Sequence, residues 1–392
     1  RWPPIDGLHM ISDGLTNVLA NLGTSASKSA AGQYLPSVIS ADELRASYQS
    51  SWVCRNAIDL PVDDATSKWR TWIGQPEQVY QVLDIESRIN LRQRVAEAIK
   101  LSRLIGGSAI FIGTDRETLS APMQPDEQIK FLNVFGADQI ALDASAQNRL
   151  TTSDEQQLFR IDGVLVHGSR LAIFKGRYDS QNFFGASEIA AAFDTFRNAD
   201  SVAANIAELV YEAKLDVYKI PDLLSQDESD LMKRLLLAQR GKSIVNAIVM
   251  DADESHEQKQ INFSGLREIL MASFQLVAGA TGIPASKLLG MPVSGLSATG
   301  EHEIRNYYDS ILMLQKNVIA PAIKTIDRLI NAEAGTDIVY EWASLWEQTE
   351  REKAEVIKTN ADTLSVIANL QVFNDEQILT ASKKLLGELM DE

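Results

Sequence analysis

The alternation of hydrophobic and polar positions divides the chain into a mixed first half and a second half dominated by long helices. Apolar residues recur every three or four positions over 186–213, 264–286 and 301–334, which is the spacing of a helix with one buried face. Between the first two of these helices, residues 214–263 include short runs of alternating apolar and polar positions, which are typical of strands. The pattern therefore predicts two long helices joined by a small β-containing insertion, followed by a third long helix in which Pro321 is expected to cause a kink.

The first half of the chain has the pattern of an α+β fold. Ser40, with Glu43 three positions later, is the signature of a capping box, so the first firm helix is expected to begin there. Residues 1–40 are rich in small and polar side chains and are expected to form a mobile N-terminal arm, either reaching a neighbouring subunit or remaining a loose tail. The pattern also predicts a helix over 85–105 and strands over 106–113, 129–135, 157–161 and 170–175.

A loop is expected between the second and third long helices. Residues 287–300 are dense in Gly, Ser and Pro, while Ser264 is a plausible cap for the helix before them. Periodicity alone favours an ordinary helical hairpin, but a solvated loop rarely carries so many apolar side chains. The candidate loop residues are Lys287, Leu288, Leu289, Met291, Pro292, Val293, Ser294, Gly295, Leu296 and Gly300.

Composition narrows the possible functions. Asp and Glu number 53 against 37 Lys and Arg, for a net charge of −16, which argues against a protein that grips DNA by neutralising phosphates. The charge does not argue against a conduit, because an acidic wall would let DNA slide without sticking, and Asp194, Asp200 and Glu208 on the first long helix are the candidate residues for such a wall. Cys54 is the single cysteine, which excludes an internal disulfide and a cysteine metal cluster, and no apolar run is long enough to span a membrane.

Apparent catalytic motifs fail on inspection. Gly295 and Gly300 have the glycine spacing of a phosphate-binding loop, but Glu301 follows where a lysine is needed to reach the phosphates. The zinc-protease pattern that begins at His302 is incomplete because Asn306 stands where the second histidine is required. The sequence therefore predicts no enzyme, no metal and no cofactor. Two other functions remain open on these grounds. One is a DNA-processing enzyme with an unrecognised site, and the other is a helical scaffold protein without a DNA channel.

Several motifs resemble those of the portal proteins of tailed bacteriophages. The resemblance is carried by residues 282–290, 295–301 and 305–309 around the expected loop, by 48–61 and 69–72 near the start, and by 166–170 and 174–176. It implies an α+β, mainly helical, ring-forming portal fold. The implied modules are an N-terminal arm (1–40), a wing (41–185), a first stem helix (186–213), a clip (214–263), a second stem helix (264–286), a tunnel loop (287–300), a long kinked wing helix (301–334) and C-terminal wing and crown helices (335–392).

The resemblance also implies the function and its partners. Portal proteins form homo-oligomeric rings, normally of twelve subunits, at one vertex of the capsid, and the tunnel loop projects into the central channel. The implied partners are further copies of the chain, double-stranded DNA, the terminase large subunit, a head–tail adaptor and the major capsid protein. The implied roles are genome packaging, DNA retention and ejection in the virion, after assembly in the host cytoplasm.

Overall fold

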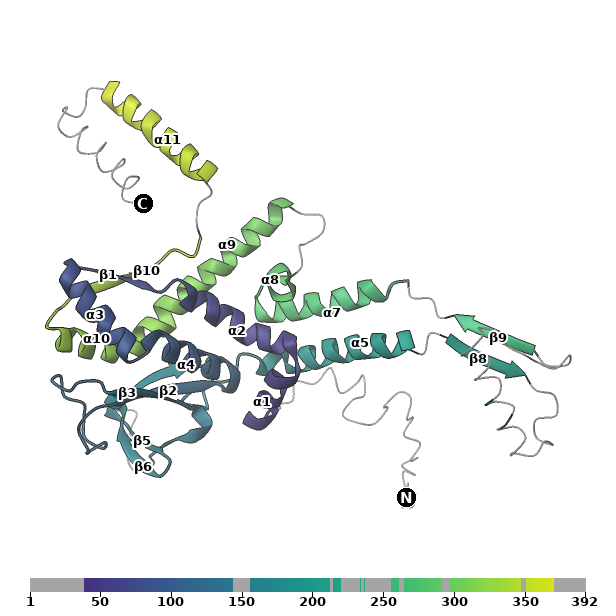
Figure 1. Ribbon diagram of the computed structural model, residues 1–392, viewed down its shortest axis with the longest axis horizontal. Helices are drawn as coiled ribbons and strands as arrows, with labels where there is room; N and C mark the ends of the chain where they lie inside the picture. The colour runs from purple at the N-terminus through teal and green to yellow at the C-terminus, as the bar shows by residue number, and fades with distance from the viewer. Residues whose placement is uncertain are drawn as a thin grey trace, which may run out of the picture.

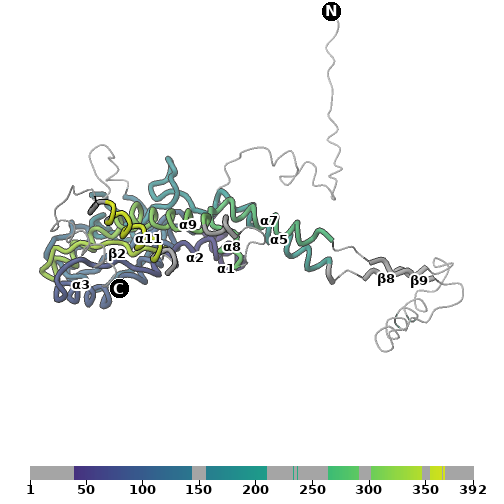
Figure 2. The backbone as a smooth tube through the Cα atoms, turned by 90° about the horizontal axis from the view of Figure 1, so that it is seen from above, coloured from purple at the N-terminus to yellow at the C-terminus, as the bar shows by residue number. Residues whose placement is uncertain are grey.

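The computed structural model describes residues 39–143, 156–211, 214–219, 255–260, 264–290, 297–346 and 350–369, together with Lys233 and Leu236. Helices dominate, with four small antiparallel sheets among them, so the expected α+β, mainly helical class is confirmed. A body of helices and strands occupies one end of the molecule, and the pair α5 and α7 projects from it toward the two-stranded sheet β8–β9 (Figure 1). The same extended outline is seen from above in Figure 2.

The described helices are α1 (Ala41–Ser50), α2 (Trp52–Ser67), α3 (Pro76–Arg88), α4 (Leu91–Ile105), α5 (Phe193–Tyr211), α7 (Leu266–Thr281), α8 (Ala285–Leu289), α9 (Ser297–Leu314), α10 (Ala320–Ala334) and α11 (Glu350–Asn369). The described strands are β1 (Arg70–Ile73), β2 (Gly107–Gly113), β3 (Phe131–Gly136), β4 (Ile140–Leu142), β5 (Leu158–Ile161), β6 (Val164–His167), β7 (Leu171–Lys175), β8 (Lys214–Lys219), β9 (Ser255–Gln260) and β10 (Val339–Trp342). The four sheets have the orders β1–β10, β3–β2–β7, β4–β5–β6 and β8–β9.

Strand β2 separates two hydrophobic cores. Because successive side chains of a strand point to opposite faces, Ile110 and Ile112 pack into the larger core with α4, whereas Ala109 and Phe111 pack into a smaller one. All seven residues of β2 are buried. Phe159 at the centre of the smaller core has no exposed surface. The two cores are thus joined through one central strand.

Two expected helix boundaries differ from the structure. The capping box of Ser40 and Glu43 is confirmed, since each side chain accepts the backbone N–H of the other residue. The helix ends at Ser50, however, and Ser51 caps α2 as a separate helix. The single helix expected over 85–105 is two helices, α3 and α4, because the chain turns at Asn90, whose φ of 51° lies in the left-handed region that asparagine tolerates.

The two long helices α5 and α7 pack against each other side by side (Figure 1). The first begins at Phe193, not at residue 186, because the segment before it bonds to the end of α4: Glu188 N–H and Ser187 Oγ both donate to the Arg103 carbonyl. The second begins at Leu266 after Gly265, whose φ is 89°, so Ser264 is not its cap.

The predicted sheet at the far end of this helix pair is present, although one strand is shifted. Strands β8 and β9 pair in antiparallel register from Lys214 opposite Gln260 to Lys219 opposite Ser255. The alternating pattern of the sequence places the second strand at 258–263, and the structure begins it three residues earlier, at Ser255. The sequence also predicts a helix over 225–240, of which the structure describes only Lys233 and Leu236, both helical. A strand predicted over 244–250, a helix predicted over 374–389 and residues 1–38 of the expected arm lie outside the described residues.

The third long helix begins earlier than expected and changes its winding before Pro321. Helix α9 starts at Ser297, and a π-helical turn, η8 (Gln315–Ile319), connects it to α10. Proline has no backbone N–H to donate to the preceding turn, so a wider turn just before it is a physically reasonable adjustment. Gln315 in this turn is fully buried and donates through Nε2 to the Ala65 carbonyl at 2.8 Å, which attaches η8 to α2.

A buried arginine ties β1, α3 and α10 together. Arg70 has a fully buried side chain that donates to Glu86 Oε1 through Nε and Nη2, and its Nη1 lies 2.7 Å from Asp327 Oδ1. The guanidinium also lies over the rings of Trp72 and Tyr340 at 4.6 and 4.3 Å. Two carboxylates therefore share one cation in this cluster.

We predict that burial of Asp327 makes the stability of the fold depend on pH. Burial raises the pKa of Asp327 to about 6, although Arg70 opposes the shift. A raised pKa means that the folded state binds the proton of Asp327 more tightly than the unfolded state does. The resulting contribution to stability is complete below the ordinary pKa near 3.8 and is lost as the pH rises through 6. The free energy of unfolding, relative to that of Asp327→Asn, should fall by at most about 3 kcal/mol between pH 4 and 7, at 1.36 kcal/mol per pKa unit. Urea titrations at several pH values measure this difference, and a flat difference would contradict it.

Candidate channel-loop site

The connection between α7 and α9 begins with a short ordered helix. Helix α7 ends at Gly282, whose φ is 69° and whose N–H donates to the Ala278 carbonyl. Pro284 then starts α8, and its carbonyl accepts the N–H groups of Lys287 and Leu288 at 2.9 Å. Gly290, with φ of 64°, ends α8. Gly282 and Gly290 thus both adopt the left-handed backbone conformation, which glycine reaches without steric strain.

Helix α8 is attached to α2 by its backbone and by an apolar side chain. Leu288 has no exposed surface and packs in the larger core. Asn56 in α2 donates through Nδ2 to the Leu288 carbonyl at 3.1 Å, so one of the carbonyls left unpaired at the end of a helix is satisfied. The start of the expected loop is therefore held against α2 and the larger core.

Lys287 is held by a second group of contacts. Its Nζ lies 2.6 Å from Asp64 Oδ2, which also accepts the hydroxyl of Tyr307 at 2.7 Å. The same Nζ donates to the Tyr308 hydroxyl at 3.3 Å and lies 5.0 and 4.7 Å from the rings of Tyr307 and Tyr308. Burial, together with the hydrogen bond to Asp64, raises the pKa of Tyr307 far above its ordinary value, so its hydroxyl remains a donor. The lysine, carboxylate and two tyrosines connect α8, α2 and α9.

The structure corrects part of the expected loop. Lys287, Leu288 and Leu289 lie in helix α8, because Pro284 begins a helical turn there and the core buries Leu288. Gly300 lies in α9, which starts four residues before the expected position. Lys287, the one cation among the candidate loop residues, is paired with Asp64. The other six candidates, Met291, Pro292, Val293, Ser294, Gly295 and Leu296, lie outside the described residues.

We predict that Lys287→Met loosens α8 without unfolding the chain. The substitution keeps the apolar stem but removes the charged partner of Asp64, and a hydrogen bond to a charged group contributes about 1.5–3 kcal/mol. Both side chains are about one-fifth exposed, so solvent reduces the effect toward the lower value. Hydrogen exchange of the α8 amides should accelerate while that of β2 stays unchanged. Unaltered exchange in α8 would show that Lys287 does not anchor it.

The three candidate channel-wall acids do not share one face of α5. At about 100° per residue, Asp194 and Glu208 lie within roughly 40° of each other around the helix, whereas Asp200 is about 120° from Asp194. Asp194 and Glu208 are exposed. Asp200 is half-buried and lines a groove of about 500 Å³ between α1 and α5, together with Cys54. Cys54 itself is buried, and burial raises the pKa of its thiol, which keeps it protonated.

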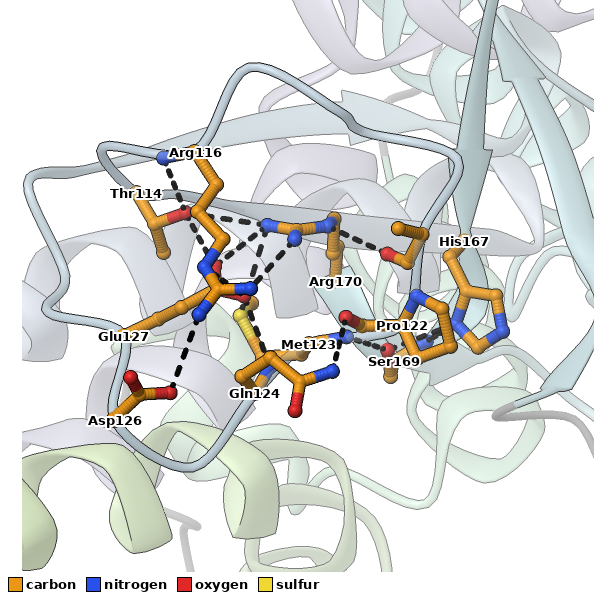
Figure 3. Close-up of polar contacts among 11 residues, drawn as sticks. Thr114, Arg116, Pro122, Met123, Gln124, Asp126, Glu127, His167, Ser169 and Arg170 are labelled. Carbon is orange, nitrogen blue, oxygen red and sulfur yellow. Dashed lines mark hydrogen bonds and ion pairs between the residues drawn. The ribbon is translucent and has the colours of Figure 1, made fainter.

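A second buried arginine holds the segment that connects β2 to β3 (Figure 3). Arg170 donates to Glu127 through Nη1 and Nη2 at 2.9 and 3.1 Å, and through Nε to the Ala121 carbonyl at 3.0 Å. Burial acts to raise the pKa of Glu127, but hydrogen bonds from Thr114, the backbone of Gln124 and Arg170 outweigh it and lower that pKa. The cluster fixes a connecting segment, which is a structural task.

The same figure shows a serine beside a histidine. Ser169 Oγ lies 2.8 Å from His167 Nδ1 and accepts the Met123 N–H at 2.8 Å. Nδ1 also accepts the Ser169 N–H at 3.2 Å, and the neighbouring carboxylate of Glu127 is bonded to Arg170. A catalytic triad needs a third group that orients the histidine, and Glu127 is committed elsewhere. The pair closes a turn between β6 and β7.

Searches for a metal site and for a membrane span gave no candidate in the part of the chain that the structure describes. No group of three or more His, Cys, Asp or Glu side chains is arranged to hold a metal ion among these residues. No described helix is long and apolar enough to cross a membrane.

Sequence reasoning missed the partners that hold the channel-loop site. Asp64 and the roles of Asn56, Tyr307 and Tyr308 were not predicted, although three of these residues lie inside the motifs that resemble portal proteins. The resemblance thus marked these positions, but the contacts that Asn56 and Asp64 make with Leu288 and Tyr307 join positions more than 200 residues apart.

Comparison with known proteins gives two curated relatives with a shared name. The chain is 34% identical over 408 residues to a protein of Sphingomonas paeninsulae named "Anti-CBASS protein Acb1", covering 96% of the chain and 65% of the relative. A protein of Caulobacter sp. (strain RHG1) with the same name is 32% identical, covering 92% of the chain and 63% of the relative. The chain therefore spans just under two-thirds of the length of these relatives.

Structural and family comparisons agree with the resemblance found in the sequence. The fold is similar to a chain in the neck of a native gene transfer agent particle computed with C12 symmetry, with a TM-score of 0.54 and 16% identity over 88% of this chain and 92% of that one. A family model described as "Phage portal protein" matches residues 42–366. The expected family and fold are thereby confirmed, and the chain belongs to the phage portal protein family.

Proposed function

We propose that the chain is the subunit of a homo-oligomeric portal ring, with twelve subunits as the expected number, and that double-stranded DNA passes through its central channel. The observation that carries this proposal is the family match over residues 42–366. The C12 symmetry named for a similar particle neck supports a closed ring of many subunits. The proposed role is mechanical rather than enzymatic: packaging, retention and ejection of a genome.

The shape of the subunit supports a division of labour within such a ring. The body of α1–α4, β2, β3 and β7 would form the wing, and α5 with α7 the stem (Figure 1). Strands β8 and β9 belong to the proposed clip over 214–263, which would dock the terminase large subunit and later the head–tail adaptor. The rim of the wing would contact the major capsid protein. The ring would reside at one vertex of the virion after assembly in the host cytoplasm.

The connection between α8 and α9 is the proposed constriction of the channel. Anchoring of α8 through Leu288, Asn56 and Lys287 gives that connection a fixed base on the wing. Met291–Leu296 would then project toward the DNA, with Asp194 and Glu208 of the stem facing the channel as acids that discourage phosphate contacts. Asp200, which lines the groove beside α1, is the least suited of the three to a channel wall.

The name of the curated relatives suggests a second candidate, an anti-CBASS function. We do not extend it to this chain, because the chain spans only 65% of the Sphingomonas relative, and a whole protein's activity need not lie in the matched part. The residues that do match form a portal fold, for which a conduit is the simpler assignment.

Mass measurement of the purified chain tests the proposal. A closed ring of twelve 43.2 kDa subunits is expected, seen end-on by negative-stain microscopy as a disc with a central opening. The same preparation should elute at an unchanged size when nuclease is added, since protein contacts would hold the ring. A monomer or dimer at all concentrations tested would overturn the ring assignment.

A further inference from the structure

A positively charged cavity lies where the end of α7 and the middle of α9 meet α2 and α4. It has a volume of about 430 Å³, and most of its wall is apolar, formed by side chains such as Ile283, Ile311 and Leu314. Its charged lining residues are Arg103, Arg177 and Glu188, so the cavity carries one net positive charge in a chain whose net charge is −16. A positive cavity in so acidic a protein requires a physical explanation.

Arg103 has no ion-pair partner within the described part of the chain. Its Nη2 donates to the Ala57 carbonyl at 3.2 Å, and its buried Nε has no hydrogen-bond partner. Glu188, the acid that lines the same cavity, is bonded to Arg177 at 2.7 Å, and no described carboxylate forms an ion pair with Arg103. Burial lowers the pKa of Arg103, Glu188 and Tyr307 oppose this shift without outweighing it, and the charge of Arg177 adds to the lowering. A buried, unpaired charge destabilises a fold unless something neutralises it.

We propose that this cavity binds an oxyanion through Arg103, and that in the assembled ring the oxyanion is a carboxylate side chain of the neighbouring subunit. The second part rests on the proposed ring. Guanidinium groups pair well with carboxylates. The apolar wall suits the methylene stem of an inserted acidic side chain better than a hydrated free ion, and the volume exceeds what a small ion fills. With 53 carboxylates in each copy, a second subunit supplies the required group at high local concentration.

The first test uses the unassembled subunit, with glutarate as a soluble stand-in for the carboxylate. Glutarate at constant ionic strength, compared with chloride, should raise the midpoint of thermal unfolding by about 2 °C, because a ligand that binds only the folded state stabilises it. Arg103→Met should abolish the rise. Arg92→Met, on the exposed side of the same helix, should keep it and serves as the control of equal charge change. An equal rise in wild type and Arg103→Met would overturn the oxyanion site.

A second variant keeps the test decisive if Arg103→Met does not fold. Glu188→Gln removes the negative charge of the cavity and releases Arg177, while the backbone bond from Glu188 N–H to the Arg103 carbonyl is retained. Glutarate binding should tighten by at least about tenfold in this variant, equivalent to ~1.4 kcal/mol. Unchanged or weaker binding would contradict the proposal.

The same measurement on the ring fraction identifies the ligand. If a neighbouring carboxylate occupies the cavity, glutarate should leave the unfolding midpoint of the ring unchanged, and Arg103→Met should shift the equilibrium from rings toward subunits. A ring that responds to glutarate as the subunit does would overturn the neighbour's carboxylate but leave the oxyanion site intact. If no ring forms, the proposed function fails while the subunit result still decides the cavity.

Discussion

Replacing Arg70 by Met is expected to lower the free energy of unfolding by about 4 kcal/mol, within the range measured when one partner of a buried ion pair is removed. Arg70 has no exposed side-chain surface and neutralises both Glu86 and Asp327. Its loss leaves two buried carboxylates without a cation beneath the Trp72 and Tyr340 rings. Met fills much of the same volume, so the loss reflects charge more than packing. Urea titration at pH 7 measures the change as a shift of the midpoint with an unchanged slope.

Two controls separate this charge effect from other causes. Arg94→Met makes the same change of charge at an exposed pair with Glu97, where about 0–1 kcal/mol is expected. Adding Glu86→Gln and Asp327→Asn to Arg70→Met should recover much of the loss, since no buried charge then remains. If the triple variant is as unstable as Arg70→Met alone, the arginine contributes through packing and the charge argument is wrong.

Local signals predicted the regular parts of the fold. The stripes of apolar residues gave α5 and α7, and the capping box gave the start of α1. Asp followed by Gly is a local turn signal, and the Asp162–Gly163 pair, with φ of 48° and 82°, forms the turn between β5 and β6. Each of these features depends on residues that are close in sequence, so a pattern can reveal it.

Features that depend on partners distant in the sequence could not be predicted from local patterns. Helix α8 is only five residues long, too short for a periodic pattern, and exists because Asn56 and Asp64 hold it from α2. Arg70 and Arg170 appear in the sequence as two of many surface charges, and only the fold buries each beside its carboxylates. Charge counting therefore said nothing about the buried ion pairs of the protein.

Replacing Met291–Leu296 by a Gly-Ser segment of equal length is expected to leave ring assembly intact and to slow DNA packaging at least about tenfold, a rate change equivalent to ~1.4 kcal/mol in the barrier. The two ends of the replaced segment follow from the structure, because the residues before Gly290 belong to the anchored α8 and those from Ser297 onward belong to α9. The substitution removes the apolar side chains of Met291, Val293 and Leu296 while keeping the connection between the two helices. DNA protected from nuclease inside assembled particles is the measure.

The expected loss of packaging follows from how the connection between α8 and α9 is anchored. Leu288 is fully buried, and the Asn56 and Lys287 contacts fix the base of the segment, so a change beyond Gly290 should not reach the wing core. A connection of Gly and Ser would lack apolar surface to pack against the next subunit or to bear on passing DNA. Lys287→Met, with the native segment retained, is the control that loosens the base alone. If the Gly-Ser variant fails to form rings, the segment is part of the subunit interface and the proposed constriction must lie elsewhere.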